Sequence, residues 1–287
     1  MNSNEPLVSV LMTAYNREKY IAEAIESVLA STYNNYELII VDDCSSDNTV
    51  KIAQIYAAND NRINIYVNEA NLGDYPNRNK AASYAKGVYL MSVDSDDKIL
   101  PEGILVCLDL MRDFPNCNFA MRVFNGRKEP YFLTPEAIIR EHFFENALLV
   151  IGPGGTVINR EYFNKIGRYP EKYGPANDMY FNLNAASNTD TLLIPVEFQY
   201  YRRHEGQELN NKFSYLYNTY LYLKDALNLL KLPLTKVEIQ WLNNKNRRRF
   251  TTNFIMYFLK TGNLKKSSFA LSEARFTFTD FLKGIFH

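Results

Sequence analysis

The first hundred residues alternate between two hydrophobic patterns. Short apolar runs predict strands buried on both faces, at Leu7–Met12, Tyr36–Val41, Ile63–Val67 and Val88–Val93. Between the first two runs, Arg17–Ala30 carries apolar residues three and four positions apart, which predicts a helix with one buried side. The β-α-β alternation predicts an α/β fold with a Rossmann-like, mostly parallel sheet that is flanked by helices.

Turn and cap residues indicate where the other helices of this half begin. Ser46 or Asp47 is placed to cap a helix that runs to about Ala57. A third helix is expected over Pro76–Ala85, and Pro101 lies near the first position of the next one. Every predicted strand is therefore followed by a loop and a helix.

Polar clusters follow three of the predicted strands, at Thr13–Asn16, Asp42–Asp43 and Asp94–Asp97. One such cluster alone is weak support for a site, because loops between strands and helices are polar by default. In a parallel sheet, however, the carboxyl ends of the strands meet at one edge, where ligands bind. The sequence therefore predicts a ligand site built from all three clusters.

The acidic segment Asp94-Ser95-Asp96-Asp97 places three carboxylates within four residues at a strand end. These groups repel one another unless something positive lies among them. Mg²⁺ and Mn²⁺ take oxygen ligands and often bind through few carboxylates together with substrate phosphates. The alternative is an ordinary acidic turn before the helix that begins near Pro101.

After about Asn211 the pattern changes to long helical stretches that are rich in Tyr and Phe. Pro233 and Gly262 are expected to break this region into two or three helices, packed on the body or on a partner. The region from Asn211 to His287 holds 13 Lys/Arg against 4 Asp/Glu, whereas the rest of the chain holds 19 against 28. An acidic body and a basic tail indicate two regions with different partners.

Composition excludes several classes of protein. The chain has 287 residues, of which 46% are hydrophobic and 22% charged, so it is neither disordered nor a repeat array. Apolar runs such as Ala147–Ile151 are far shorter than the roughly 18 residues of a membrane span. Met1–Pro6 does not resemble a signal peptide, and three cysteines lack metal spacing, so we expect a cytoplasmic chain with free thiols.

Taken together, the motifs resemble those of the family-2 glycosyltransferases with the GT-A fold. The resemblance rests on five blocks in the same order: Val8–Asn16, Glu37–Asp47, Asn71–Gly73, Arg78–Asn79 and Asp94–Asp97. It covers roughly Pro6 to Asn210. We therefore predict a GT-A catalytic domain over residues 1–210 and a basic, aromatic-rich helical C-terminal extension over residues 211–287.

The resemblance implies a nucleotide site. Thr13 and Tyr15 match residues that hold the nucleotide, with the Tyr15 ring stacked on the base. Asp43 matches an acid that accepts a hydrogen bond from the uracil ring nitrogen, and Asp42 lies beside it. Arg78 matches a basic residue near the phosphates.

The resemblance also implies a metal site for Mn²⁺ or Mg²⁺. Asp96 of the DxD motif matches the direct ligand, and Asp94 lies nearer the ribose or a metal-bound water. His204 matches a histidine that completes the metal site or contacts the diphosphate, although a lone histidine is more often structural. Arg202 or Arg203 is placed to help neutralise the leaving group.

Asp178 matches the general base of inverting members of this family, which deprotonates the acceptor hydroxyl. The alternative is that this carboxylate only stabilises the start of a helix. Asn177 stands where related enzymes frequently carry an acid. Gly152–Thr156 is either a simple turn or a segment where the backbone approaches the donor sugar and the acceptor.

We therefore predict a metal-dependent, inverting glycosyltransferase that moves a sugar from a UDP-sugar to a glycan or lipid-linked acceptor, in bacterial surface polysaccharide biosynthesis. One alternative, suggested by Asn177, is a catalytically inactive sugar-nucleotide-binding protein recruited to a membrane glycan-assembly complex. Another alternative is a dinucleotide-dependent oxidoreductase. The sequence argues against it, because Thr13–Asn16 occupies the turn where such enzymes carry a G-x-G-x-x-G motif.

The basic tail has its own alternatives. It packs on the body or self-associates, or it contacts the inner membrane surface as a peripheral, basic amphipathic segment. No nucleic acid is expected as a partner, because no known binding module is present and the body is acidic.

Overall fold

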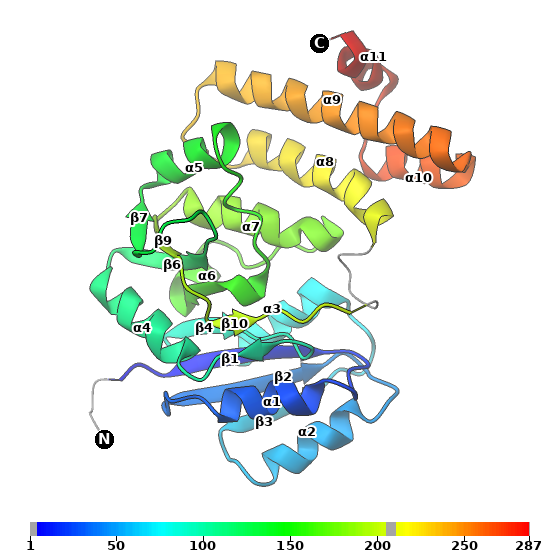
Figure 1. The fold of residues 1–287 in the computed structure, drawn as a ribbon. Helices are drawn as coiled ribbons and strands as arrows, with labels where there is room; N and C mark the ends of the chain where they lie inside the picture. The colour runs from blue at the N-terminus through cyan, green and yellow to red at the C-terminus, as the bar shows by residue number, and fades with distance from the viewer. Residues whose placement is uncertain (1–4, 205–210, 287) are drawn as a thin grey trace.

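The sheet of this protein joins strands from all parts of the first 200 residues (Figure 1). The computed structural model describes residues 5–204 and 211–286. The strands are β1 (Val8–Ala14), β2 (Tyr36–Asp42), β3 (Ile63–Val67), β4 (Tyr89–Ser92), β5 (Lys98–Ile99), β6 (Cys117–Arg122), β7 (Tyr131–Leu133), β8 (Thr156–Asn159), β9 (Asp190–Ile194) and β10 (Gln199–Tyr200).

The main sheet has the order β3-β2-β1-β4-β8-β6-β9-β7, and β5 pairs separately with β10. The pairs among β1 to β4 and the pair β6–β9 are parallel, whereas β8 and β7 run antiparallel to their neighbours. The mostly parallel sheet flanked by helices that the sequence predicts is thus confirmed.

Helices cover both faces of the sheet and continue beyond it (Figure 1). They are α1 (Ile21–Leu29), α2 (Thr49–Ala57), α3 (Asp74–Tyr84), α4 (Gly103–Asp113), α5 (Pro135–Phe144), α6 (Arg160–Lys165), α7 (Asn177–Ala186), α8 (Lys212–Leu229), α9 (Lys236–Thr261), α10 (Leu264–Glu273) and α11 (Phe278–Phe286). Two short 3-10 helices, η1 (Pro153–Gly155) and η2 (Gly174–Ala176), precede β8 and α7.

Strand β2 shows why apolar runs without alternation form the centre of this sheet. All seven of its residues are buried. Leu38 and Ile40 belong to the core cluster that includes α1, α2 and α4. Ile39 and Val41 belong to the cluster on the other face, with α3, α6 and α7. Each side chain therefore meets a helical layer, as expected for a strand covered on both faces.

The predicted helix starts differ from the observed ones by one to four residues, including α3, which begins at Asp74 rather than Pro76. Helix α1 begins at Ile21 rather than Arg17, because the intervening residues form a turn at the sheet edge. The N-cap of α2 is Asn48, although the Asp47 carboxylate still accepts a hydrogen bond from the backbone N–H of Thr49. Helix α4 begins at Gly103, two residues after Pro101.

The C-terminal region forms four helices, so the prediction of two or three is wrong. The expected breaks are correct: Pro233 lies between α8 and α9, and Gly262 ends α9 with a left-handed φ of 60°. A further break that the sequence analysis did not identify occurs near Arg275, where φ is 49°. Figure 1 shows α8 and α9 stacked above α7 on the sheet domain.

The helical region shares a hydrophobic core with the sheet domain. Leu221 of α8 and Leu242 of α9 belong to the same buried cluster as Phe181 of α7. The change of texture at Asn211 coincides with the start of α8, but the apolar packing continues across it. No helix within the described ranges is both long and apolar enough to cross a membrane.

Candidate active site

The three polar clusters lie at one edge of the sheet, as the sequence predicts. Strand β1 lies between β2 and β4 and runs parallel to both, with Ala14 opposite Asp42 and Leu11 opposite Ser92. The loops that follow these strands therefore leave the sheet on the same side. All site residues discussed below come from these loops or from elements packed against them.

Asp96 and His204 meet although they are 108 residues apart in the chain. The Nε2 atom of His204 lies 2.9 Å from Oδ2 of Asp96, and both side chains are largely buried. The same carboxylate oxygen accepts a hydrogen bond from Nε of Arg17 at 3.0 Å. Tyr20 stacks on the His204 ring with 4.9 Å between centroids, which orients the imidazole. The two predicted metal ligands thus converge on one point.

Neighbouring contacts hold this acidic loop in place. Asp97 accepts a hydrogen bond from the backbone N–H of Arg202 at 2.9 Å, and Nε of Arg202 donates to the carbonyl of Asp96. The guanidinium of Arg202 also pairs with Glu23 at 2.8 Å. Burial, together with the charge of Asp94, raises the pKa of Asp97 to about 7. Arg202 therefore fastens the segment around His204 to the DxD loop.

Arg78 links the DxD motif to helix α3. Its NH1 atom donates to Oδ1 of Asp94 at 2.7 Å, and its Nε donates to Oδ1 of Asp74 at 2.8 Å. Burial disfavours the charged form of Arg78 and lowers its pKa, but the carboxylates of Asp74 and Asp94 outweigh this effect. Together they raise the pKa of Arg78 well above the ordinary value. The predicted phosphate-binding residue is thus a buried cation with two carboxylates beside it.

Asp42 and Asp43 are buried at the end of β2 and accept hydrogen bonds from two different loops. The Asp42 carboxylate accepts hydrogen bonds from the backbone N–H and the hydroxyl of Ser45. Asp43 accepts from the N–H of Leu72 at 2.8 Å and of Gly73 at 2.9 Å. Its Oδ1 also accepts from Asn68 at 2.7 Å. Asp43 thereby holds the loop before α3 against the end of β2.

Tyr15 offers an exposed ring at this edge. Its side chain lies just beyond β1 and the residue is 47% exposed, whereas Thr13 inside the strand is half-buried. Asn16 follows with a left-handed φ of 52°, and its Oδ1 accepts a hydrogen bond from the N–H of Ser46. This turn joins the β1 loop to the β2 loop and leaves the Tyr15 ring free for stacking.

Asp178 lies buried in the first turn of α7. Its Oδ1 accepts a hydrogen bond from the backbone N–H of Met179 at 2.7 Å. Burial raises its pKa to about 7, while Arg78 and Tyr75 act in the opposite direction. Burial raises the pKa of Tyr169 above its ordinary value, and Asp178 and Asp94 act in the same direction while Arg78 opposes them.

The glycine segment lies beside this carboxylate. A side-chain carbon added to Gly152 would lie 3.8 Å from Oδ2 of Asp178, and one added to Gly154 would lie 2.7 Å from the amide oxygen of Gln199. Pro153–Gly155 forms η1, which leads directly into β8. The segment therefore lies beside Asp178, and its approach to the donor sugar and the acceptor stays a prediction.

Asn177 uses its side chain locally. Its Oδ1 accepts from the backbone N–H of Tyr173 at 2.9 Å, and its Nδ2 donates to the carbonyl of Gly174 at 2.8 Å. Both ends of the amide therefore close the turn at η2. A carboxylate here would lose the second bond, so the asparagine has a structural reason that does not involve loss of activity.

Two residues of this site were missed in the sequence analysis. Arg17 was assigned to a helix, and Asp74 was not considered, yet each pairs with a residue of the predicted site. Arg17 follows Tyr15 by two positions in a loop already assigned to the sheet edge. Examining that loop for cations, as well as for acids, would have identified it.

Comparison with known proteins identifies the family of this chain. The sequence profile of glycosyl transferase family 2 matches residues 9–167. A putative teichuronic acid biosynthesis glycosyltransferase, TuaG of Bacillus subtilis (strain 168), is 34% identical over 171 residues, which cover 58% of this chain and 67% of TuaG. Matches to three further relatives span only 34% to 38% of those proteins.

Two other similarities extend over most of the chain. A UDP-Glc:alpha-D-GlcNAc-diphosphoundecaprenol beta-1,3-glucosyltransferase, WfgD of Escherichia coli, is 29% identical over 238 residues, covering 80% of this chain and 89% of WfgD. The structure of S. aureus TarS residues 1–349 in complex with UDP-GlcNAc superposes with a TM-score of 0.73 at 21% identity, over 97% of this chain and 81% of that 1–349 chain. The fold is therefore GT-A, and the chain belongs to glycosyl transferase family 2.

Proposed function

We propose that this chain transfers a sugar from a UDP-sugar to a hydroxyl of a glycan or lipid-linked acceptor, with inversion, in bacterial polysaccharide assembly. The observation that carries the proposal is the convergence at one sheet edge of Tyr15, the DxD loop, His204 and the buried Asp178. The names of TuaG and WfgD support polysaccharide assembly, and the UDP-sugars named for WfgD and for the TarS complex support the donor class.

The donor nucleotide is assigned to the β1 and β2 loops. The exposed Tyr15 ring can stack on a base, an interaction worth about 1–3 kcal/mol in other nucleotide binders. Asp43 accepts three hydrogen bonds from the loop between β3 and α3, and a carboxylate has about four acceptor positions, so one remains for a base N–H. In this proposal Thr13 and Asp42 support the same pocket.

A divalent metal ion fits the pair formed by Asp96 and His204. Among the described residues no group of three His, Cys, Asp or Glu side chains is arranged for a metal ion. Two converging donors nevertheless suit Mn²⁺ or Mg²⁺, which commonly complete their coordination with phosphate oxygens. Such an ion would supply positive charge where the departing diphosphate becomes more negative.

Cationic side chains of the chain itself would act on the same phosphates. Arg78 is held at the DxD motif by Asp94, so its position is set before any ligand binds. Arg17 donates to the Asp96 oxygen that faces His204, so in this proposal it adds a further positive charge beside the diphosphate. Arg203 is exposed, whereas Arg202 is bonded to Asp96 and Glu23, which favours a structural role for Arg202.

Asp178 is the proposed general base. The acceptor oxygen attacks the anomeric carbon from the face opposite the nucleotide and forms the new C–O bond. The bond from that carbon to the diphosphate oxygen breaks, and UDP leaves with the electron pair. The acceptor proton passes to the carboxylate of Asp178, whose pKa of about 7 suits a base at neutral pH.

Isothermal titration with UDP, with and without Mn²⁺, tests the donor and metal assignments. We expect binding by the wild type to need Mn²⁺, and the Asp96→Ala variant to lose that dependence. Asp109→Ala is the matched control, because Asp109 is a partly exposed carboxylate on α4 that pairs only with Arg112. UDP binding that is identical with and without Mn²⁺ in all three proteins would refute the metal site, and no binding at all would refute the UDP-sugar donor.

A further inference from the structure

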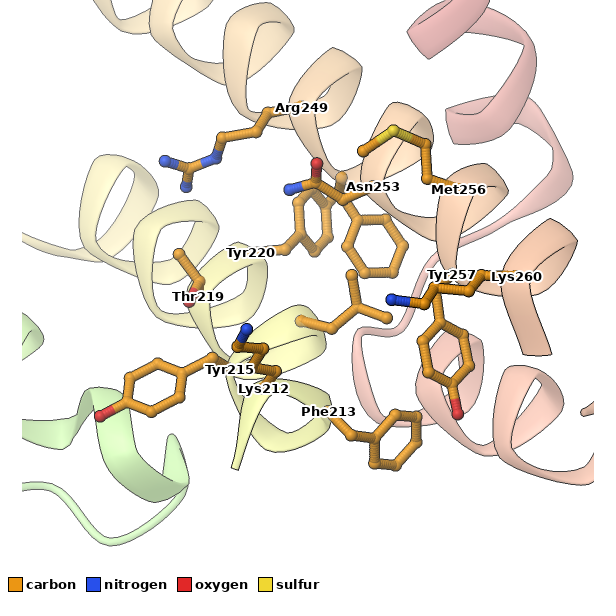
Figure 2. A pocket seen from close by; sticks show the side chains of 12 residues that line it. Lys212, Phe213, Tyr215, Thr219, Tyr220, Arg249, Asn253, Met256, Tyr257 and Lys260 are labelled. Carbon is orange, nitrogen blue, oxygen red and sulfur yellow. The ribbon is translucent and has the colours of Figure 1, made fainter. Parts of the chain in front are cut away.

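A cavity of about 450 Å³ lies between α8 and α9, and its walls come from these two helices (Figure 2). This volume lies within the range of about 300–1,000 Å³ that is typical of small-molecule sites. None of the residues assigned above to sugar transfer lines the cavity. It is therefore a second candidate site, separate from the strand ends.

The floor of the cavity is aromatic and follows from the antiparallel packing of the two helices. Phe213 at the start of α8 contacts Tyr257 near the end of α9, with 5.3 Å between ring centroids. Tyr220 contacts Phe250 at 4.8 Å, further along both helices. Tyr220 is seven positions after Phe213 on the same helix, so the floor extends roughly 10 Å along the axis. A floor of this length accommodates a short segment of hydrocarbon chain.

The rim of the cavity is cationic. Lys212, Arg249 and Lys260 line it, and no Asp or Glu does. Lys266 of α10 adds a fourth cation, with its ammonium 5.3 Å from the Phe213 ring centroid. Within the described ranges, neither Lys212 nor Lys260 forms an ion pair with a carboxylate. The rim is therefore complementary to an anionic group.

The three arginines of the basic run Arg247–Arg249 do not all contribute to the cationic rim. Arg247 pairs with Asp280 at 3.1 Å and so fastens α11 to α9. Arg248 is exposed and lies outside the cavity, whereas Arg249 lines it. Only one of these three arginines thus serves the cationic rim, and its neighbour Arg248 is a natural control.

Exposed apolar side chains gather beside the cavity, where α9 ends and α10 begins. Leu259 is 76% exposed, Leu264 is 73% exposed, and Met256, which lines the cavity, is 58% exposed. Phe269 is 48% exposed, and its ring contacts Tyr217 at 5.7 Å. Large apolar side chains next to lysines are typical of a surface that meets the interface of a bilayer.

We propose that this cavity binds an anionic membrane phospholipid, with its phosphate at Lys212 and Lys260 and the adjoining hydrocarbon on the aromatic floor. Lys266, Leu259 and Leu264 then face the same lipid surface. The proposal goes beyond sugar transfer and does not depend on it. It develops the membrane-contact alternative for the basic tail by naming one occupant of defined chemistry.

Helix α8 places this lipid site close to the candidate active site. One side of α8 forms the cavity, and the other side contacts η2, where a carbon added to Gly174 would lie 2.6 Å from the Asn218 amide. Asp178 follows η2 by two residues. Lys212 is eight residues after His204, so their Cα atoms are at most about 28 Å apart. A protein bound to lipid in this way would hold its acceptor side near the membrane surface.

Titration of the full chain with decyl phosphate, decyl glucoside and inorganic phosphate, below the micelle concentration, tests the site. We expect decyl phosphate to bind most tightly, because each buried methylene adds about fourfold and the phosphate meets the cationic rim. Inorganic phosphate binding as tightly as decyl phosphate would reduce the cavity to a simple anion site and overturn the proposal. Equal binding of decyl glucoside would overturn the role of the rim.

Variants assign the binding to this cavity. Lys212→Gln combined with Lys260→Gln is expected to weaken decyl phosphate binding about tenfold. Asn253→Trp, which enlarges an exposed side chain over the cavity, is expected to weaken it without changing charge. Arg248→Gln is the matched control and is expected to bind like the wild type. Equal losses in Arg248→Gln and the double variant would overturn the assignment.

Vesicles then test the membrane source of the ligand. The wild type is expected to sediment with vesicles containing phosphatidylglycerol and to remain in solution with phosphatidylcholine alone. The double variant is expected to lose sedimentation while its unfolding temperature stays unchanged. Binding of decyl phosphate without any binding to phosphatidylglycerol vesicles would overturn the phospholipid as occupant. These assays contain no donor sugar, so their outcome is independent of the transfer reaction.

Discussion

The sheet domain and the C-terminal helices use polar side chains in opposite ways. In the sheet domain, key polar contacts join residues far apart in the chain, such as His204 with Asp96 at a separation of 108 residues and Arg17 with Asp96 at 79. In the helical region, Thr235 pairs with Glu238 and Thr277 with Asp280, each three residues away. Long-range polar contacts thus build a site in the sheet domain, whereas in the helical region the long-range pair of Arg247 and Asp280 fastens one helix to another.

Apolar side chains show the opposite difference. In the sheet domain, apolar side chains are buried on both faces of the sheet, and the polar residues of the candidate site lie at one edge. In the helical region the large apolar residues Leu259, Leu264 and Phe278 are each more than 70% exposed. The contrast teaches that the first region is organised around a polar site, whereas the second presents an apolar and cationic surface.

The strongest test of the polar site is Asp178→Asn. The variant keeps the shape of the side chain and removes the base, so we expect transfer to fall by about 10²–10⁴-fold while UDP binding is retained. A radiolabelled transfer assay and UDP titration measure the two effects. Asn182→Ala is an unsuitable control because Asn182 is buried and bonded to Ile151, so Asp109→Asn serves instead.

The Asp178→Asn result separates the two proposed identities. An enzyme loses transfer in this variant and keeps nucleotide binding. A protein that only binds sugar nucleotides shows no transfer in the wild type, and the variant changes nothing. Unchanged transfer in the variant would refute Asp178 as the base.

The pH dependence of transfer is the next largest effect. Burial raises the pKa of Asp178 to about 7, and the base acts only when it has lost its proton. We therefore expect kcat/KM to fall about tenfold per pH unit below about 7 and to level off above it. A profile that stays flat from pH 8 to pH 5 would show that the base titrates as an ordinary, solvated aspartate.

Alanine substitutions at two glycines, one in each region, compare how tightly the two regions are packed. A carbon on Gly87 would lie 2.5 Å from the backbone nitrogen of Ser9 in β1, whereas one on Gly284 would meet the hydroxyl of Thr251. A strand backbone cannot move aside, so Gly87→Ala is expected to lower the free energy of unfolding by about 3 kcal/mol. For Gly284→Ala we expect a smaller loss of about 1–2 kcal/mol, because alanine favours helix but the Thr251 hydroxyl must leave its hydrogen bond to the carbonyl of Arg247.

Urea denaturation of both glycine variants measures this difference. Gly262→Ala is a poor control, since its φ of 60° is itself strained for alanine. Gly126 has the same limitation, so the wild type is the reference. Equal losses in the two variants would contradict the view that α11 is held by adaptable side-chain contacts.

The smallest expected effect concerns the capping box of α9. Thr235 accepts a hydrogen bond from the N–H of Glu238, whose carboxylate in turn accepts from the N–H of Thr235. Thr235→Ala is expected to cost about 1 kcal/mol of unfolding free energy. Thr252→Ala, at an exposed position inside the same helix, is the control and should change stability by less than about 0.5 kcal/mol. Equal effects would show that the local cap does not stabilise α9.

Sequence alone predicted the first half of the sheet domain, β1 to β4, because the signals there are periodic or local. Apolar runs in β1 and β2 showed burial on both faces, and the polar residues after β1, β2 and β4 defined the site edge. Pro233 and Gly262 marked two helix ends correctly, because each restricts the backbone by itself. The family followed from motifs whose order is visible in the chain.

Only the tertiary structure decided which side chains meet. In the folded chain Arg17 donates a hydrogen bond to Asp96, and Arg78 donates to both Asp74 and Asp94. The side-chain amide of Asn177 bonds within its own loop. The tertiary structure also joined α8 and α9 around an aromatic cavity that neither helix encloses alone. Periodicity identifies the buried face of an element, but the pairing of side chains depends on the positions of elements distant in the chain, which no local pattern contains.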